Sequence, residues 1–137
     1  MALHLEIVTP ERKIFSDTVG NVYLPGADGE LGILDGHAAM VTALQPGELR
    51  YEKGGQIVSM VVGSGFAEIT QHNVNVLTDL ATDADQIDEA KVEAAMQRAH
   101  DELAQIDHAE DAEEVAHLQG VIAKSLAQLR LKRRTHS

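Results

Sequence analysis

The sequence contains no cysteine, and this absence removes several kinds of chemistry at once. Disulfide bridges, thiolate metal sites and thiol nucleophiles are excluded, and a chain without cysteine fits a reducing, intracellular compartment. Aromatic residues are also scarce, because the 137 residues include two phenylalanines, two tyrosines and no tryptophan. A surface that stacks nucleic acid bases needs several aromatic side chains. The composition therefore argues against a nucleic acid-binding protein.

Long apolar runs are missing as well. No stretch approaches the roughly 18 consecutive apolar residues of a membrane-spanning helix, and the amino terminus lacks the basic region and apolar run of a secretory signal. We therefore expect a chain that is soluble or associates only peripherally with a membrane, without direct insertion.

The charge is strongly negative overall but reverses at the carboxyl-terminal end. Acidic residues outnumber basic residues by 22 to 11, a net charge of −11, which disfavours general binding to nucleic acid or to an anionic bilayer. Residues 124–137, however, hold five basic residues and no acidic one. These cations either complement the dipole of a solvated helix end or, as a group, dock on an acidic partner. They are Lys124, Arg130, Lys132, Arg133 and Arg134.

Residues up to about Asp79 have the pattern of short strands separated by turns. Apolar and β-branched residues alternate or form short runs, and clusters of Gly, Pro, Asn and Asp interrupt them about every ten residues. This spacing is typical of the antiparallel hairpins of a sandwich or barrel. The expected strands cover residues 3–8, 19–24, 31–34, 40–44, 49–52, 57–62, 66–69 and 74–77.

From Asp85 the pattern becomes helical, since Ala, Glu, Gln and Leu dominate. Asp85 is the expected cap of a first helix, with Asp88 at its third position. Two amphipathic stripes, separated by the acidic stretch 107–114, predict an antiparallel helical hairpin. The stripes are Val92, Ala95, Met96, Ala99, Leu103 and Ile106, then Val115, Leu118, Ile122, Leu126 and Leu129.

We therefore predict an α+β chain, with an antiparallel β-sandwich or barrel over residues 1–84 and a two-helix hairpin over 85–137. The stripes are rich in alanine, so the hairpin buries little apolar area per turn and should be held weakly. The helices either pack only on each other or also open and pack on a partner.

The patterns required for catalysis fail on spacing. Gly63-Ser64-Gly65 is neither a nucleophile elbow nor a dinucleotide fingerprint, because its glycines flank the serine directly and Glu68 stands where a third glycine belongs. The seven histidines form no metal-ligating pair on a helix face, and the acidic stretch 107–114 lacks the ligand pattern of a calcium loop. No Walker-type phosphate loop exists. We therefore expect neither an enzyme nor a metal site.

Several segments together resemble one family along essentially the whole chain. Residues 29–38 read Gly-Glu-Leu-Gly-Ile-Leu-Asp-Gly-His-Ala, similar to the Gly-Glu-Leu-Gly-Ile and Pro-Gly-His signature of ATP synthase epsilon subunits. The segments 6–11, 44–49, 62–69, 73–77, 87–90 and 126–130 resemble further landmarks in the family's order. The chain is thus identified as resembling the epsilon subunit of a bacterial F-type ATP synthase.

The resemblance implies a non-catalytic stalk subunit at the cytoplasmic face of the bacterial inner membrane. Its sandwich would join the gamma subunit to the c-subunit ring, so that proton-driven rotation turns gamma inside the catalytic head. Glu30, Leu31 and Gly32 match the loop region that approaches the ring, and His37 lies in the motif beside it. Glu30 can equally be a solvated carboxylate at the start of a strand, and His37 can be a turn residue whose hydrogen bonds are satisfied locally.

The resemblance also implies a regulatory tail. Its helices would extend into the head of α and β subunits, where the five basic residues named above would meet carboxylates of the β subunit. This insertion would block ATP hydrolysis more than synthesis. Some family members bind ATP in the folded hairpin, and Asp88, Lys91 and Arg98 occupy the corresponding positions. Lys91 and Val92 replace an Arg-Ala pair of that motif, and a lysine cannot grip phosphate as a guanidinium does. We expect weak or absent regulatory ATP binding and no required cofactor.

A second departure is Asp35, which stands where the family usually has proline; it should loosen that turn but preserve it, because Asp-Gly also forms turns. Two other hypotheses remain at this point. An adaptor with a dimerising helical tail would need a sustained heptad seam, for which the helices are too short and too rich in alanine. A small hydrolase would need the paired catalytic groups that the sequence lacks.

Overall fold

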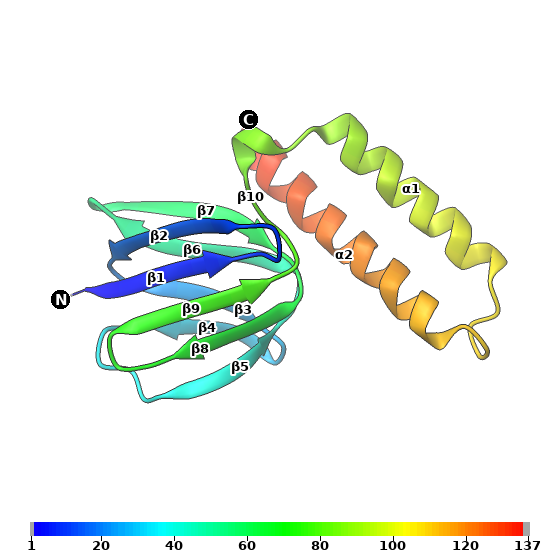
Figure 1. Cartoon of the computed structure of the whole chain (residues 1–137). Helices are drawn as coiled ribbons and strands as arrows, with labels where there is room; N and C mark the ends of the chain where they lie inside the picture. The colour runs from blue at the N-terminus through cyan, green and yellow to red at the C-terminus, as the bar shows by residue number, and fades with distance from the viewer. Residues whose placement is uncertain (1, 136–137) are drawn as a thin grey trace.

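A computed structural model describes residues 2–135, which form a β-sandwich followed by two helices (Figure 1). The predicted α+β class is confirmed. The strands are β1 (Leu3–Val8), β2 (Lys13–Val19), β3 (Val22–Gly26), β4 (Gly29–Ile33), β5 (Met40–Leu44), β6 (Gly47–Lys53), β7 (Gln56–Val62), β8 (Gly65–Ile69), β9 (Asn73–Thr78) and β10 (Ala81–Asp83). A short 3-10 turn, η1 (Ala84–Gln86), leads to α1 (Glu89–Gln105) and α2 (Ala112–Thr135).

The strands form one sheet that folds over on itself in the order β10-β7-β6-β3-β5-β8-β9-β1-β2, with β4 paired to β3. Only the Gly26–Leu44 pair joins β3 to β5, so the sheet bends there. At the other end, the Gly20 amide donates to the Glu52 carbonyl at 2.7 Å, and the Phe15 and Tyr51 rings are in tilted contact with centroids 4.8 Å apart. The sandwich is therefore nearly closed. Contrary to the all-antiparallel prediction, β1 and β9 run parallel.

One apolar core fills the sandwich, and its buried members all come from strands. The alternation in β1 is typical: Leu3, Leu5 and Ile7 are fully buried, whereas His4, Glu6 and Val8 are half-buried. Other strands contribute Val19, Val22, Leu24, Ile33, Leu44, Leu49, Tyr51, Met60, Val62, Ala67, Ile69, Val74 and Val76. The sandwich thus holds a core independent of the helices.

The strand prediction failed at three places, one of which is the short β10 that it did not include. The expected strand over residues 19–24 is the end of β2 and the start of β3, separated at Gly20 and Asn21. Most of β2 was missed because its Ser16, Asp17 and Thr18 make it polar for a strand. As an edge strand paired only with β1, β2 keeps much of its surface in solvent.

The first helix begins later than predicted. Asp88, not Asp85, is its cap, and the Asp88 carboxylate accepts a hydrogen bond from the Lys91 amide at 3.2 Å. Asp85 lies inside η1, which Asp83 caps. The delay has a packing reason, because Ile87 between the two helical segments is extended and buried against the sandwich.

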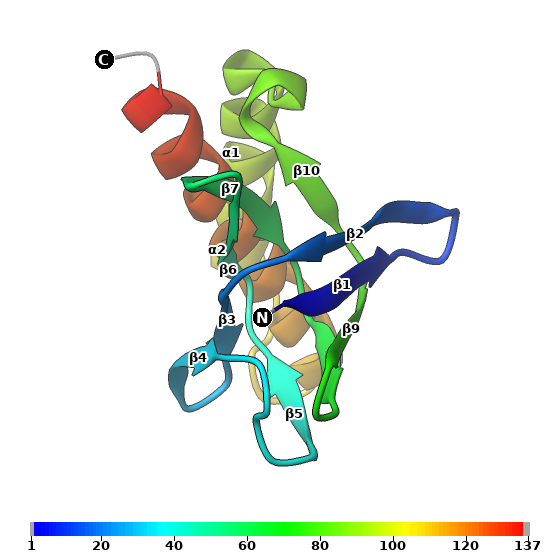
Figure 2. The same ribbon diagram turned by 90° about the vertical axis from the view of Figure 1, so that its left-hand side faces the viewer.

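The helices lie side by side beyond one end of the sandwich, with α2 between the sandwich and α1 (Figures 1 and 2). A second apolar cluster joins Val61 of β7 to Ile87, Ala127 and Leu131. Leu118 and Leu129 are buried as predicted, but Leu126 is exposed, and Ala127 and Leu131 lie outside the predicted stripe. A single stripe could not describe α2, because this helix packs against both α1 and the sandwich. No helix within residues 2–135 is long and apolar enough to cross a membrane.

Candidate functional site

The basic end of α2 is bound to the sandwich and to α1. Lys124 pairs with Asp79 at 3.1 Å, next to the β9–β10 corner. The Lys132 ammonium donates to the Ala84 carbonyl at 2.9 Å, and Arg133 pairs with Glu89 at 3.2 Å and with Glu93. Arg134 donates from both terminal guanidinium nitrogens, Nη1 and Nη2, to the Glu48 carboxylate of β6. Arg130 is exposed and has no ion pair with another described residue.

Charge fixes the Arg134–Glu48 contact at neutral pH. The Arg134 hydrogen bonds lower the pKa of Glu48 despite partial burial, and the charges of Arg50 and Arg130 act in the same direction. In turn, the Glu48 carboxylate raises the pKa of Arg134. A bidentate guanidinium–carboxylate pair adds orientation to charge. The end of the tail is therefore held on the sandwich at a defined position.

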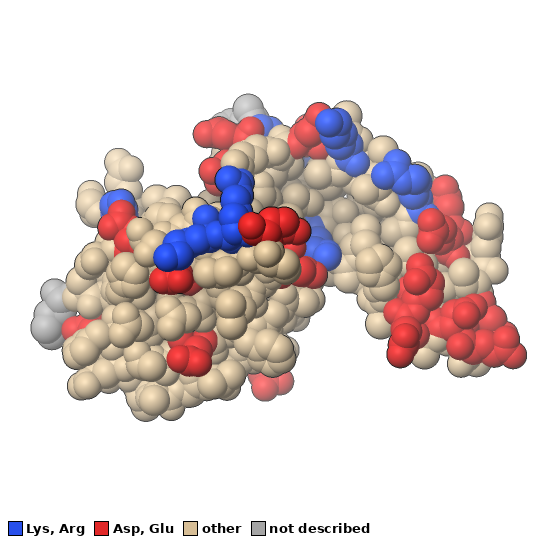
Figure 3. Space-filling view, viewed as in Figure 1, with Lys and Arg blue, Asp and Glu red and all other residues tan. Residues whose placement is uncertain are grey.

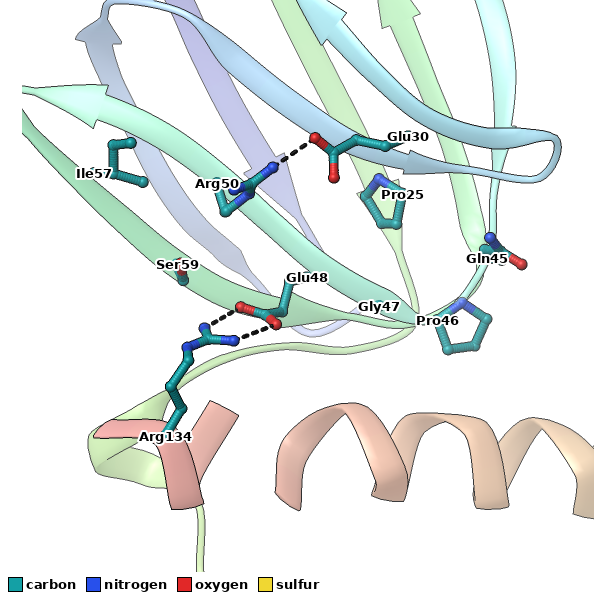
Figure 4. Close-up of a pocket in the computed structure, with 10 residues that line it drawn as sticks. All are labelled: Pro25, Glu30, Gln45, Pro46, Gly47, Glu48, Arg50, Ile57, Ser59 and Arg134. Carbon is teal, nitrogen blue, oxygen red and sulfur yellow. Dashed lines mark hydrogen bonds and ion pairs between the residues drawn. The ribbon is translucent and has the colours of Figure 1, made fainter. Parts of the chain in front are cut away.

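An open cleft of about 660 Å³ lies beside this pair on the outer face of β3, β4 and β6 (Figure 4). Within it, Glu30 of β4 accepts from Arg50 of β6 at 2.5 Å. The Arg50 guanidinium also lies 5.0 Å from the centre of the Tyr23 ring. The cleft thus places the Glu30–Arg50 pair next to the Glu48–Arg134 pair.

The residues predicted to face the ring do not form one cluster. Glu30, Leu31 and Gly32 lie in β4, where Leu31 packs against the core and Gly32 opposes Tyr23. His37 lies in the β4–β5 loop, at the other end of β4 from Glu30. Its Nδ1 lies 2.7 Å from the Ala38 carbonyl oxygen, so the ring contacts its own turn.

Asp35 anchors the His37 loop instead of leaving it untethered. The Asp35 carboxylate contacts Nδ1 of His72 at 2.8 Å, and the Gly36 amide donates to the Gln71 carbonyl at 2.8 Å. The Asp-Gly turn is therefore present, as predicted. It is tied to the β8–β9 turn at the end of the sandwich away from the helices (Figure 1).

An exposed apolar surface lies on the outer face of β5, β8 and β9, beside the exposed carboxylate of Glu68, and the sequence analysis missed it. Phe66 and Leu77 are direct cross-strand partners and are 58% and 56% exposed; Val41, two residues before Phe66's partner Ala43, is 68% exposed. Figure 3 shows few charged side chains on this face. A pocket of about 480 Å³ continues the face past Leu77 to Val8 and Pro10. The alternation of apolar and polar residues in the sequence predicted an outward side for each strand. Only the register between β5, β8 and β9 brings Val41, Phe66 and Leu77 together.

The three candidate nucleotide ligands lie on α1. Asp88 is occupied as the helix cap, and Lys91 and Arg98 are exposed on the same helix. Lys91 and Arg98 are seven residues apart and share a helix face. Arg133 is the arginine that α2 brings to α1, and it is paired with Glu89 and Glu93. Among residues 2–135, no group of three His, Asp or Glu side chains could hold a metal ion.

Comparison with known proteins identifies relatives along the whole chain. The family model described as "ATP synthase, Delta/Epsilon chain, beta-sandwich domain" matches residues 2–84. The ATP synthase epsilon chain of Desulforamulus reducens is 50% identical over 99 residues, covering 72% of this chain and 75% of that one. The epsilon chain of Herpetosiphon aurantiacus is 37% identical over 135 residues, covering 97% and 99%.

The fold has also been seen in a solved assembly. A chain in the OSCP/F1/c-ring structure of the Euglena gracilis mitochondrial ATP synthase superposes with a TM-score of 0.77. The two chains are 24% identical, and the match covers 94% of this chain and 79% of the other. This likeness concerns the architecture of the sandwich and its two helices.

Proposed function

Because the chain belongs to the family of ATP synthase epsilon chains, we propose that it is a rotor subunit that joins gamma to the c-subunit ring. Epsilon is a stalk subunit and not a catalytic one, so the hydrolase hypothesis is dropped. The adaptor hypothesis is dropped too, since the relatives belong to a defined assembly. The subunit would lie peripherally at the cytoplasmic face of the bacterial inner membrane.

The observation that carries the proposal is the apolar surface of Val41, Phe66 and Leu77. Soluble chains seldom leave large apolar side chains grouped in solvent, and such groups mark protein interfaces. The surface lies on β5, β8 and β9, whereas α2 contacts β6 and β7 on the opposite side of the folded-over sheet. Its side chains are exposed although the tail is docked, so docking leaves the surface accessible. It therefore suits a permanent partner such as gamma, whereas Glu30 and His37 remain candidates for contacts with the ring.

Replacing Phe66 with serine is expected to weaken binding to purified gamma by about tenfold to a hundredfold, because a central aromatic contact contributes about 1–3 kcal/mol. Its exposure means that the fold should persist. The matched control is Ile57→Ser, which removes a 59% exposed side chain from β7 on the other sheet and should bind normally. Surface plasmon resonance measures both. Equal affinity of Phe66→Ser and the parent chain would refute this surface, and no binding by the parent would refute the stalk role.

The basic tail supports a second part of the proposal, which is inhibition of ATP hydrolysis by extension into the α/β head. Lys124, Lys132, Arg133 and Arg134 are all engaged within the folded chain. They can reach carboxylates of another subunit only after α2 leaves the sandwich. The docked arrangement would therefore be the non-inhibitory state.

Nucleotide regulation is proposed to be absent. Asp88 is used as a cap, and Lys91 and Arg98 are exposed on one helix. Arg133, the arginine that α2 brings to α1, is already paired with Glu89 and Glu93. Millimolar ATP is therefore expected to leave the melting temperature of the chain unchanged in differential scanning fluorimetry. The double variant Lys91→Arg/Val92→Ala, which restores the motif, tests whether those positions alone prevent binding. A rise in melting temperature with ATP in the parent chain would contradict the proposal.

A further inference from the structure

The cleft of Figure 4 is lined both by Glu30 of β4 and by Arg134 of the docked tail. Glu30 belongs to the segment proposed to approach the ring, and Arg134 belongs to the docked tail. They are joined through β6, because Glu30 pairs with Arg50 and Arg134 pairs with Glu48. Arg50 and Glu48 are two residues apart on the same face of that strand.

Arg50 therefore acts on both carboxylates. Its guanidinium is bonded to Glu30, and its charge also contributes to the lowered pKa of Glu48. With Glu30, Arg50 and Glu48 all charged, the sandwich offers one net negative charge to Arg134. If a cationic side chain of a partner pairs with Glu30, Arg50 loses this carboxylate. The Arg50 charge then neutralises Glu48 and repels Arg134.

We propose that Glu30 and Arg50 set the strength with which the tail docks, so that a partner's cation at Glu30 releases the tail. Within residues 2–135, the ion pair described for Glu30 is with Arg50 of β6, so Arg50 carries its influence to Glu48. The cleft beside Glu30 and Arg50 is open, which gives a partner's side chain access to the pair. The link to the ring rests on the proposed function, but the coupling itself belongs to the isolated chain.

The coupling predicts effects of opposite sign from two neighbouring substitutions. Glu30→Gln leaves the docking site without net charge and should lower the docking equilibrium constant about two- to fivefold, the range of exposed ion pairs. Arg50→Gln leaves two carboxylates for Arg134 and should raise the constant by a similar factor. The double variant restores one net negative charge and should return close to the parent value.

Docking can be measured in the full-length chain by single-molecule fluorescence transfer. The absence of cysteine allows one dye at Gln71→Cys in the β8–β9 turn and another at Glu110→Cys in the α1–α2 turn. The docked fraction is read in mild denaturant, where the parent is partly undocked. Glu68→Gln, an exposed carboxylate on the opposite sheet, controls for overall charge, and Glu48→Gln removes the docking contact directly.

Opposite shifts for Glu30→Gln and Arg50→Gln, with Glu68→Gln unchanged, would support the coupling. Shifts in the same direction, or parent values for both, would overturn it. No gamma or ring is present in this measurement, so its outcome is independent of the stalk role. Gamma binding by a chain that shows no coupling would leave the proposed function standing and refute only this inference.

Discussion

A chain that ends at Ala84 is expected to bind gamma as tightly as the full-length chain but to lose suppression of ATP hydrolysis. The sandwich should fold alone, because the buried members of its core all come from β1 to β9. Truncation uncovers Val61, which the tail buries, and a buried valine contributes about 1.5–3 kcal/mol. We therefore expect a lower melting temperature but a cooperative transition in circular dichroism.

The functional part of this prediction is measured with the catalytic α/β/gamma assembly in a steady-state hydrolysis assay. Arg130→Gln in the full-length chain is the matched variant, because Arg130 has no ion pair with any other residue of 2–135 in the docked state. Its loss should weaken inhibition without forcing the tail to undock. Equal suppression by the truncated and full-length chains would eliminate the inhibitory tail. A folded truncation that fails to bind gamma would instead show that the hairpin contributes to that interface.

Replacing Gly65 with alanine is expected to cost the sandwich about 3 kcal/mol or more, a loss typical of backbone clashes. Gly65 starts β8, pairs with both β5 and β9, and has φ of +156°. An added Cβ would lie 1.9 Å from the Leu77 carbonyl oxygen, which is backbone and cannot rotate away. Thermal or urea unfolding followed by circular dichroism measures the loss.

Two other glycines provide the comparison. Gly120 lies in α2 with nothing within 4 Å of an added Cβ, so Gly120→Ala should stabilise the chain by about 0.5–1 kcal/mol. At Gly63 an added Cβ meets the Asp79 carboxylate at 1.9 Å and the Lys124 Cδ at 3.1 Å. Gly63→Ala should therefore disturb the Asp79–Lys124 pair and weaken tail docking more than the sandwich. Parent-like unfolding of Gly65→Ala would contradict the steric argument.

Local sequence patterns were sufficient to predict secondary structure where a single segment buries one of its faces. The alternation of β1, the turn residues between strands and the change to helical periodicity from Asp85 each follow from neighbouring residues, and they predicted the α+β class. The motif at residues 29–38, with the further landmarks, was sufficient for the family. Prediction failed at β2, whose polar residues face solvent along an edge, and at the start of α1, where Ile87 packs against the sandwich.

The partners of charged residues could not be predicted from local patterns, because they depend on which surfaces meet. The positive pole of the tail was recognised in the sequence. Its acceptors, however, lie far away along the chain: Asp79 is 45 residues from Lys124, and Glu48 is 86 residues from Arg134.

The sequence by itself determined most of the elements and the separation of an acidic body from a basic tail, because short-range periodicity and composition encode them, and its motifs determined the family. Only the tertiary structure decided that β1 and β9 are parallel and that Phe66, Leu77 and Val41 form one surface. It also decided that β6 pairs with Glu30 through Arg50 and with Arg134 through Glu48. These relations depend on strand register and on the docking of α2, and both result from burial between residues distant in sequence.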